Sequence, residues 1–224
     1  MRIAIVGAGL MGRLTAITLH RQGHRISLFD KDDKSAHQSA AYAAAGLLTP
    51  LGESLHSEPN IVDMGFASLK LWPTILASLS DYTFFQQEGA LMVSHEQDKG
   101  DYLRFARHLH RHYPQHQVQQ VNRQQLEQLE PELGRSFNQG LFLPEEGQIG
   151  NRKLLLALRH ELEQEAVNWQ SGCHIDTIEP QESGCRLHFN DQYQDFDLAI
   201  DCRGLGARKN HNKHAHDFDD LRAV

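Results

Sequence analysis

The sequence lacks long hydrophobic runs and an excess of basic residues. No stretch approaches the roughly 18 consecutive apolar residues of a membrane-spanning helix, so we expect no membrane span. The net charge is −7 with histidine neutral, and no basic cluster is large enough to cover a face. This charge balance argues against nucleic acid as a partner. With 40% hydrophobic and 23% charged residues, the 224-residue chain has the composition of a globular protein with one large domain or two small ones.

Cysteine is also scarce. Cys173, Cys185 and Cys202 are an odd number at wide spacing, which fits neither a disulfide framework nor a paired metal-binding motif. We therefore expect a reducing compartment. The N-terminal run superficially resembles a short signal peptide, but its glycines and the strand pattern that follows favour a fold element, so we interpret the chain as unprocessed and cytoplasmic. The sequence carries no sign of an oligomeric state.

Histidine is abundant, but the spacing typical of metal ligands is missing. His108, His110 and His112 lie in a helical pattern, with no carboxylate or cysteine at a zinc-like spacing. We predict a solvated helix face there and no metal site. A second histidine group lies in the polar segment 208–217, which we predict to be a loop.

The first thirty residues predict a strand, a helix and a second strand. Residues 2–6 form a short apolar run bounded by glycine, as expected of a parallel strand that is buried on both faces. A helix should follow over 10–21 and end at Gly23. Residues 25–30 read as the second strand, which finishes on Asp30.

The loop between the first strand and the helix has the G-x-G-x-x-G pattern. Its residues are Gly7, Ala8, Gly9, Leu10, Met11 and Gly12. The first glycine permits a tight turn, the second lets the backbone approach a pyrophosphate, and the third allows the helix to pack on the strand. The helix N-terminus offers N–H groups and the positive end of its dipole to the phosphates. The pattern therefore predicts an adenine dinucleotide site, and by itself leaves NAD and FAD both open.

Asp30 completes this pattern. It lies eighteen residues after Gly12, at the end of the second strand. A carboxylate at this place accepts hydrogen bonds from the adenosine ribose hydroxyls and repels a 2′-phosphate, which disfavours NADP. Asp30 and the adjacent Lys31 are therefore further cofactor-binding candidates.

The rest of the chain alternates between helical and strand patterns. Helices are expected over 60–80, 96–112 and 123–129, and over 151–165 with Asn151 as the N-cap. Strands are expected over 89–94, 117–121, 140–144, 173–178, 185–189 and 196–201. The middle of the chain thus interrupts the sheet of the nucleotide domain as an inserted domain. We predict an α/β fold, in which a Rossmann-like, doubly wound and mainly parallel sheet carries an inserted α+β domain.

Residues 39–48 are mostly small and apolar. Many small side chains in succession suggest a backbone that lies close against a bulky group. The composition taken alone favours a plain alanine-rich helix instead.

Four blocks of the sequence resemble the D-amino acid oxidase superfamily of flavoproteins, and most of all its glycine oxidase branch. The blocks are residues 5–12 with 28–30, residues 43–48, residues 140–147, and residues 198–206 before 221–224. The first block is generic to dinucleotide folds and the second is specific. The resemblance implies FAD as the cofactor, with 1–50 and 150–224 as a discontinuous FAD-binding domain and 51–149 as part of a substrate domain.

The resemblance also implies further cofactor contacts. Ala44, Ala45, Gly46 and Leu47 would lie near the isoalloxazine and ribityl chain, where close approach to a flat ring explains the small side chains. The adenine-contacting strand of the family matches 173–178, with Ile175 as the best single match. The strand that returns to the pyrophosphate matches the one ending at Cys202, Arg203 and Gly204. Arg203 departs from the small residue usual in the family, and both a phosphate contact and a solvent-facing position stay open for it.

The reaction implied by the resemblance is oxidative deamination of a small amine or amino acid. Hydride passes to flavin N5, the imine hydrolyses, and O2 is reduced to H2O2; a related dehydrogenase would instead pass electrons to a quinone or partner protein. The arginine and tyrosine that orient the substrate in the family have no counterpart here, so no catalytic residue is assigned. We expect a fragment of a longer enzyme, with a naturally truncated, non-catalytic nucleotide-binding module as the alternative.

Overall fold

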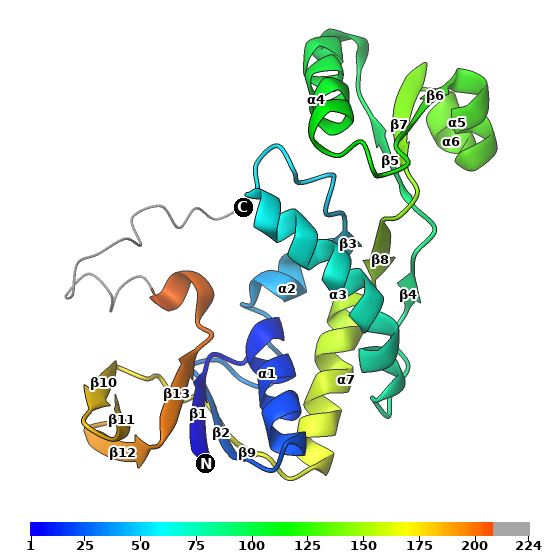
Figure 1. Ribbon diagram of the computed structural model, residues 1–224. Helices are drawn as coiled ribbons and strands as arrows, with labels where there is room; N and C mark the ends of the chain where they lie inside the picture. The colour runs from blue at the N-terminus through cyan, green and yellow to red at the C-terminus, as the bar shows by residue number, and fades with distance from the viewer. Residues whose placement is uncertain (208–224) are drawn as a thin grey trace. The chain divides into compact units, whose positions relative to one another are not determined.

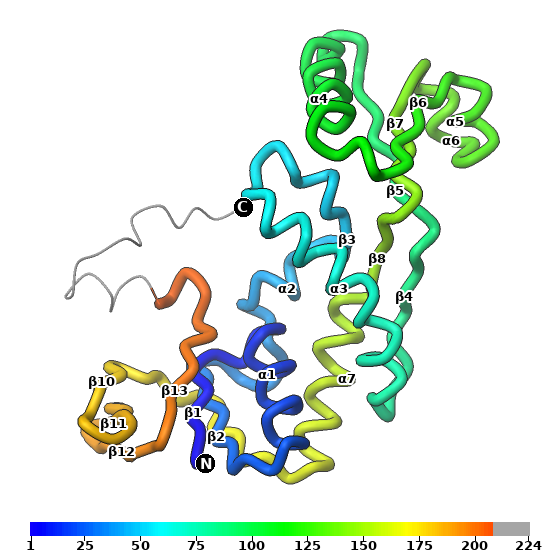
Figure 2. Tube along the Cα trace, in the orientation of Figure 1, coloured from blue at the N-terminus to red at the C-terminus, as the bar shows by residue number. Residues whose placement is uncertain are grey.

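The computed structural model describes residues 1–207 of the chain, which form two compact units. Unit 1 contains Met1–Ala45, Leu79–Thr83 and the described residues from Asn151 onward, and unit 2 contains Gly46–Ser78 and Phe84–Gly150. The chain thus passes back and forth between the units, as the colours along the trace in Figure 2 show. The predictions for 208–217 and 221–224 lie outside the described residues.

Unit 1 is built on a four-stranded parallel sheet in the order β13-β1-β2-β9. Its strands are β1 (Arg2–Val6), β2 (Arg25–Asp30), β9 (Asn168–Ser171) and β13 (Leu198–Asp201). The central strands β1 and β2 are buried almost throughout, as their continuous apolar runs predict. The predicted strands over 2–6 and 25–30 are therefore confirmed.

Helices lie on one side of this sheet (Figure 1). They are α1 (Leu10–Arg21), α2 (Ala40–Ala43) and α7 (Asn151–Gln164), and a short 3-10 helix η2 (Gly204–Ala207) follows β13. Helix α1 has the predicted bounds, and Gly23 behind it adopts a φ of +86°, which turns the chain into β2. Helix α7 contacts both α1 and α2.

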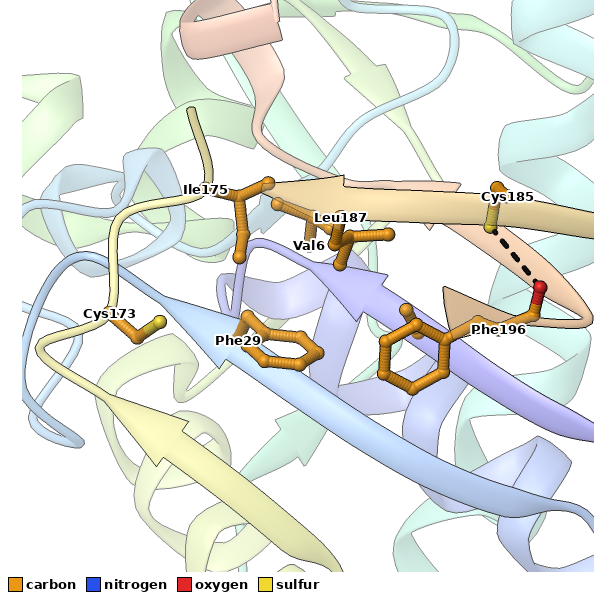
Figure 3. Packing of buried hydrophobic residues seen from close by; sticks show 8 residues of the cluster. Val6, Phe29, Cys173, Ile175, Cys185, Leu187 and Phe196 are labelled. Carbon is orange, nitrogen blue, oxygen red and sulfur yellow. Dashed lines mark hydrogen bonds between the residues drawn. The ribbon is translucent and has the colours of Figure 1, made fainter. Parts of the chain in front are cut away.

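A three-stranded antiparallel sheet packs on the β1–β2 sheet through the cluster in Figure 3. Its strands are β10 (Thr177–Gln181), β11 (Gly184–Phe189) and β12 (Gln192–Phe196). Phe29 of β2 is completely buried, and its ring meets that of Phe196 edge to face at 5.9 Å. The predicted Rossmann-like α/β fold with a parallel sheet is confirmed, with a second sheet covering one of its faces.

Unit 2 combines two small antiparallel sheets with helices. The sheet β3-β8-β4 contains β3 (Leu47–Leu48), β8 (Gly147–Ile149) and β4 (Phe85–Gln86), and the sheet β5-β7-β6 contains β5 (Ala90–Val93), β7 (Gln139–Leu143) and β6 (Gln119–Asn122). The helices are α3 (Pro59–Ala77), the 3-10 helix η1 (Glu96–Asp98), α4 (Lys99–His112), α5 (Arg123–Leu129) and α6 (Pro131–Gly134). Their core includes Leu51, Phe105 and Leu109. No helix among residues 1–207 is long and apolar enough to cross a membrane.

Two predicted strands near the C-terminal end of the described chain have wrong bounds. Residues 173–176 have no strand pairing, and β10 begins only at Thr177. The run over 196–201 is split at Asp197, where β12 ends and β13 begins. At this residue the chain leaves one sheet for the other, because the amide of Asp197 donates to the carbonyl of Arg2 and its carboxylate accepts from the Arg2 amide.

Candidate functional site

The loop from Gly7 to Gly12 joins β1 to α1 at the carboxyl edge of the parallel sheet. Gly7 has a φ of +103°, and a Cβ atom there would lie 2.6 Å from the carbonyl oxygen of Cys202. A Cβ atom on Gly12 would lie 1.8 Å from the carbonyl oxygen of Gly7. Both positions therefore exclude any side chain, as the first and third glycines of the pattern predict.

Gly9 has the opposite environment. The nearest atom to a Cβ built there is the Cβ of Ser39, at 3.7 Å, so the space beside Gly9 is open. Gly9 is also the N-cap of α1, where no side chain bonds the helix N–H groups and no acidic residue stands in the first turn. The first N–H groups of a helix have no partner within the helix, so this end of α1 is suited to an anion. Leu10 is half-buried there and Met11 is exposed.

Asp30 lies beside this loop. One carboxylate oxygen accepts a hydrogen bond from the Ala8 amide, and the other accepts from the Asp32 amide at 2.8 Å. A carboxylate offers about four acceptor positions, so Asp30 can still accept bonds from hydroxyl groups. Lys31, the next residue, is exposed.

The segment after β13 lies next to the loop, where the Cys202 carbonyl approaches Gly7. The side chain of Arg203 bonds Asp201 twice, at 2.9 Å from Nε and 2.6 Å from Nη2, and its Nη1 donates to the Ile175 carbonyl at 3.4 Å. The Arg203 side chain is only 13% exposed, so the solvent-facing alternative is wrong. Burial, with the charge of Asp201, raises the pKa of the Cys202 thiol. Gly204 is exposed.

Ile175 is almost completely buried inside unit 1. The whole residue is 2% exposed, and its side chain lies in the cluster of Figure 3, between the two sheets of unit 1. Its carbonyl accepts the bond from Arg203.

The small-residue segment is not a continuous helix. Helix α2 covers a single turn, and the chain is extended at Ala44, so the interpretation of residues 39–48 as an alanine-rich helix is wrong. Ala44 and Ala45 are exposed and are the last residues of the first segment of unit 1. Unit 2 begins with Gly46 and Leu47, and Leu47 is 63% exposed. Asn151 is the first residue of α7, and its side-chain amide donates to the carbonyls of Ala41 and Ala44.

Comparison with known proteins agrees with this geometry. A family model described as FAD dependent oxidoreductase matches residues 2–222. The chain belongs to this family.

Within the FAD-dependent oxidoreductase family, the chain is similar to the glycine oxidase of Geobacillus kaustophilus, with 26% identity over 168 residues, 70% of this chain and 42% of the relative. The crystal structure of glycine oxidase from the same organism matches 94% of this chain and 58% of that one, with a TM-score of 0.80 and 21% identity. The structure of L-proline dehydrogenase from P. horikoshii matches 94% and 55%, with a TM-score of 0.70 and 11% identity. The chain spans less than half the length of the curated glycine oxidase.

The family is FAD-dependent, and the residues of the loop fit this cofactor. Gly9 leaves open the space that a pyrophosphate needs, and the uncapped end of α1 offers N–H groups to its charge. Asp30 retains acceptor capacity for ribose hydroxyls. Among residues 1–207, no three His, Cys, Asp or Glu side chains lie close enough together to hold a metal ion.

Arg13 is a buried cation beside the loop that the sequence did not predict. Arg13 in the first turns of α1 is 1% exposed, and its guanidinium lies 4.8 Å from the ring centre of Trp169. Burial lowers its pKa to about 10, so the side chain stays charged at neutral pH. The helical repeat places Arg13 on the same face of α1 as the buried Ala16 and Ile17. A charged residue on an apolar helix face is the sequence signal that indicates a buried cation.

Proposed function

We propose that the protein oxidises the carbon–nitrogen bond of a small amine or amino acid, with this chain holding the FAD. The family match over residues 2–222 carries the proposal, and the similarity to a glycine oxidase supports the substrate class. In this proposal unit 1 is the FAD-binding domain and unit 2 is part of the substrate domain. Bound FAD would supply a two-electron acceptor for the bond that is oxidised.

The residues of unit 1 have distinct tasks in this proposal. The amides of Gly9 and Leu10 donate to the pyrophosphate, and Asp30 accepts from the ribose hydroxyls. Gly7 and Gly12 keep the loop against β1 and the Cys202 carbonyl, so that these donors stay in place. Ala44, Ala45, Gly46 and Leu47 are proposed to lie along the flavin, and the main chain near Ile175 along the adenine.

The electron acceptor is proposed to be O2, which gives H2O2 as the second product. The fold alone leaves this choice open, because both glycine oxidase and L-proline dehydrogenase share it with this chain. Measurement of peroxide under air separates an oxidase from a dehydrogenase, since a dehydrogenase needs a quinone or dye to turn over.

The proposal is tested with the full-length product of the gene that encodes this chain, purified with FAD. We expect a yellow protein whose flavin absorbance bleaches when glycine or a D-amino acid is added without oxygen, and recovers with peroxide release when air is admitted. A protein that neither contains nor takes up FAD would contradict the cofactor site. A protein that holds FAD but is bleached by no amine would contradict the substrate class and leave a nucleotide-binding module.

A further inference from the structure

Arg13 ties together three segments that surround the glycine loop. Its Nε donates to the Ala8 carbonyl at 2.8 Å, Nη1 to the Leu155 carbonyl at 2.5 Å, and Nη2 to the Lys34 carbonyl at 3.0 Å. These carbonyls belong to the loop, to α7 and to the segment after β2. The guanidinium also lies against the Trp169 ring on β9. A buried charge with this many partners fixes the relative positions of the groups that it bonds.

The bond to the Ala8 carbonyl determines where the next amide points. A trans peptide is planar, so its C=O and N–H point in opposite directions. Because the Ala8 carbonyl points inward to Arg13, the N–H of Gly9 points away from the guanidinium. The amide of Ala8 itself is bonded by Asp30, so Gly9 supplies the first amide of the loop that is directed toward a ligand.

The charge of Arg13 also strengthens this donor. A cation bonded to a carbonyl oxygen polarises the peptide, and its N–H becomes a better donor in a site of low dielectric. Asp30 and Glu163 are the anions that act on Arg13, and Arg159 is the cation that opposes it. Burial lowers the pKa of Arg13 only to about 10, which leaves the positive charge in place behind the loop.

We propose that Arg13 is a positioning residue for FAD, which orients and polarises the Ala8–Gly9 peptide so that the Gly9 amide binds the pyrophosphate. This inference rests on the proposed placement of the pyrophosphate on the loop. A lysine cannot replace Arg13, because its ammonium lacks the planar fork that reaches three carbonyls and stacks on an aromatic ring.

The test uses two probes, ADP and adenosine, and measures their binding to the full chain by calorimetry. ADP carries a diphosphate and adenosine does not, so the ratio of their dissociation constants isolates the phosphate contact. In Arg13→Lys and Arg13→Met we expect ADP binding to weaken about tenfold, as for the loss of a hydrogen bond to a charged group, with adenosine binding unchanged. The control is Arg21→Met, which removes the ion pairs of α1 with Glu161 of α7 and with Glu165 just after it, away from the loop; it should leave the ratio unchanged.

A measurement on the unmodified chain keeps the test valid if a variant does not fold. In protein labelled with 15N-glycine, the amide signal of Gly9 should shift on addition of ADP and stay in place on addition of adenosine. No shift of Gly9 with bound ADP would overturn the role of Arg13, as would equal weakening of both probes in the folded variants. If the unmodified chain binds neither ADP nor FAD, the cofactor site itself is overturned, which separates the two failures.

Discussion

The carbonyl oxygen of Gly7 lies so close to Gly12 that a Cβ atom on Gly12 would stand 1.8 Å from it. The close approach of Gly12 to Gly7 brings the first turn of α1 into contact with the end of β1. Gly9, between them, has open space and a φ of −69° that any residue can adopt. The three glycines of the motif are therefore needed for different reasons. Gly7 and Gly12 allow close packing of the backbone, and Gly9 allows a ligand to approach.

Alanine at Gly9 and Gly12 should accordingly have different effects. Gly12→Ala should lower the free energy of unfolding by about 1–3 kcal/mol through overpacking. Gly9→Ala should leave stability nearly unchanged but abolish FAD binding, because its methyl group occupies the space proposed for the pyrophosphate. Denaturant unfolding of the chain without cofactor, and flavin fluorescence titration, measure the two effects. Normal FAD binding in Gly9→Ala would exclude the loop as the pyrophosphate site.

Glu146 makes stability depend on pH. Its side chain is completely buried in unit 2 and accepts bonds from the amides of Leu51 at 2.7 Å and Gly52 at 3.0 Å. Burial raises its pKa from 4.5 to about 7. Between these values the folded chain holds a proton that the unfolded chain has released, so the free energy of unfolding falls as pH rises through this range.

The expected fall from Glu146 is ~3 kcal/mol. Glu146→Gln cannot ionise and keeps an oxygen for the two amides, so its unfolding free energy should change less between pH 4.5 and 7. Urea unfolding over this pH range measures the difference. Glu127→Gln, at an exposed position of the same unit, is the control and should behave like the unmodified chain. Parallel pH curves for Glu146→Gln and the unmodified chain would exclude Glu146 as the cause.

Arg203 should matter for both stability and adenosine binding. Arg203→Met removes the two hydrogen bonds to the Asp201 carboxylate and the one to the Ile175 carbonyl. We expect the free energy of unfolding to fall by about 1–2 kcal/mol. The substitution also frees the main chain that is proposed to meet the adenine. Arg186→Met is the matched control, because Arg186 also bonds both carboxylate oxygens of Asp195, but in a more exposed pair, and exposed pairs contribute little. Equal unfolding free energies in the two variants would show that the buried Arg203–Asp201 pair stabilises the chain no more than the exposed Arg186–Asp195 pair does.

The cysteine thiols should be unreactive in the folded chain. Burial raises the pKa of Cys173, Cys185 and Cys202, and the thiolate is the reactive form. A thiol reagent at mildly alkaline pH should therefore react slowly with native protein and rapidly with all three thiols in denaturant. Fast reaction of one thiol in the native chain would identify an activated cysteine instead.

Local patterns were sufficient where neighbouring residues decide the conformation. The apolar runs of β1 and β2, the glycine spacing of the loop and the bounds of α1 follow from periodicity and turn chemistry. The helix over 123–129 was also predicted at its observed bounds, and its N-terminus is held by a capping box between Asn122 and Gln125.

Prediction was wrong where distant segments decide. Residues 173–176 alternate apolar and polar side chains as a strand does, but Cys173 and Ile175 pack in the core between two sheets, and pairing begins only at Thr177. The apolar run over 196–201 is likewise divided by the contact of Asp197 with Arg2. Strand bounds depend on partners far along the chain, and a local pattern does not contain those partners.

The sequence by itself determined the dinucleotide-binding unit, because glycine spacing and strand periodicity are local properties, and its four family-like blocks indicated FAD. Only the tertiary structure decided how the loop is supported. Arg13, Asp30 and the Cys202 carbonyl reach the loop from α1, β2 and the segment after β13. Their meeting depends on the parallel order of the sheet, which brings the carboxyl ends of β1, β2 and β13 to one edge.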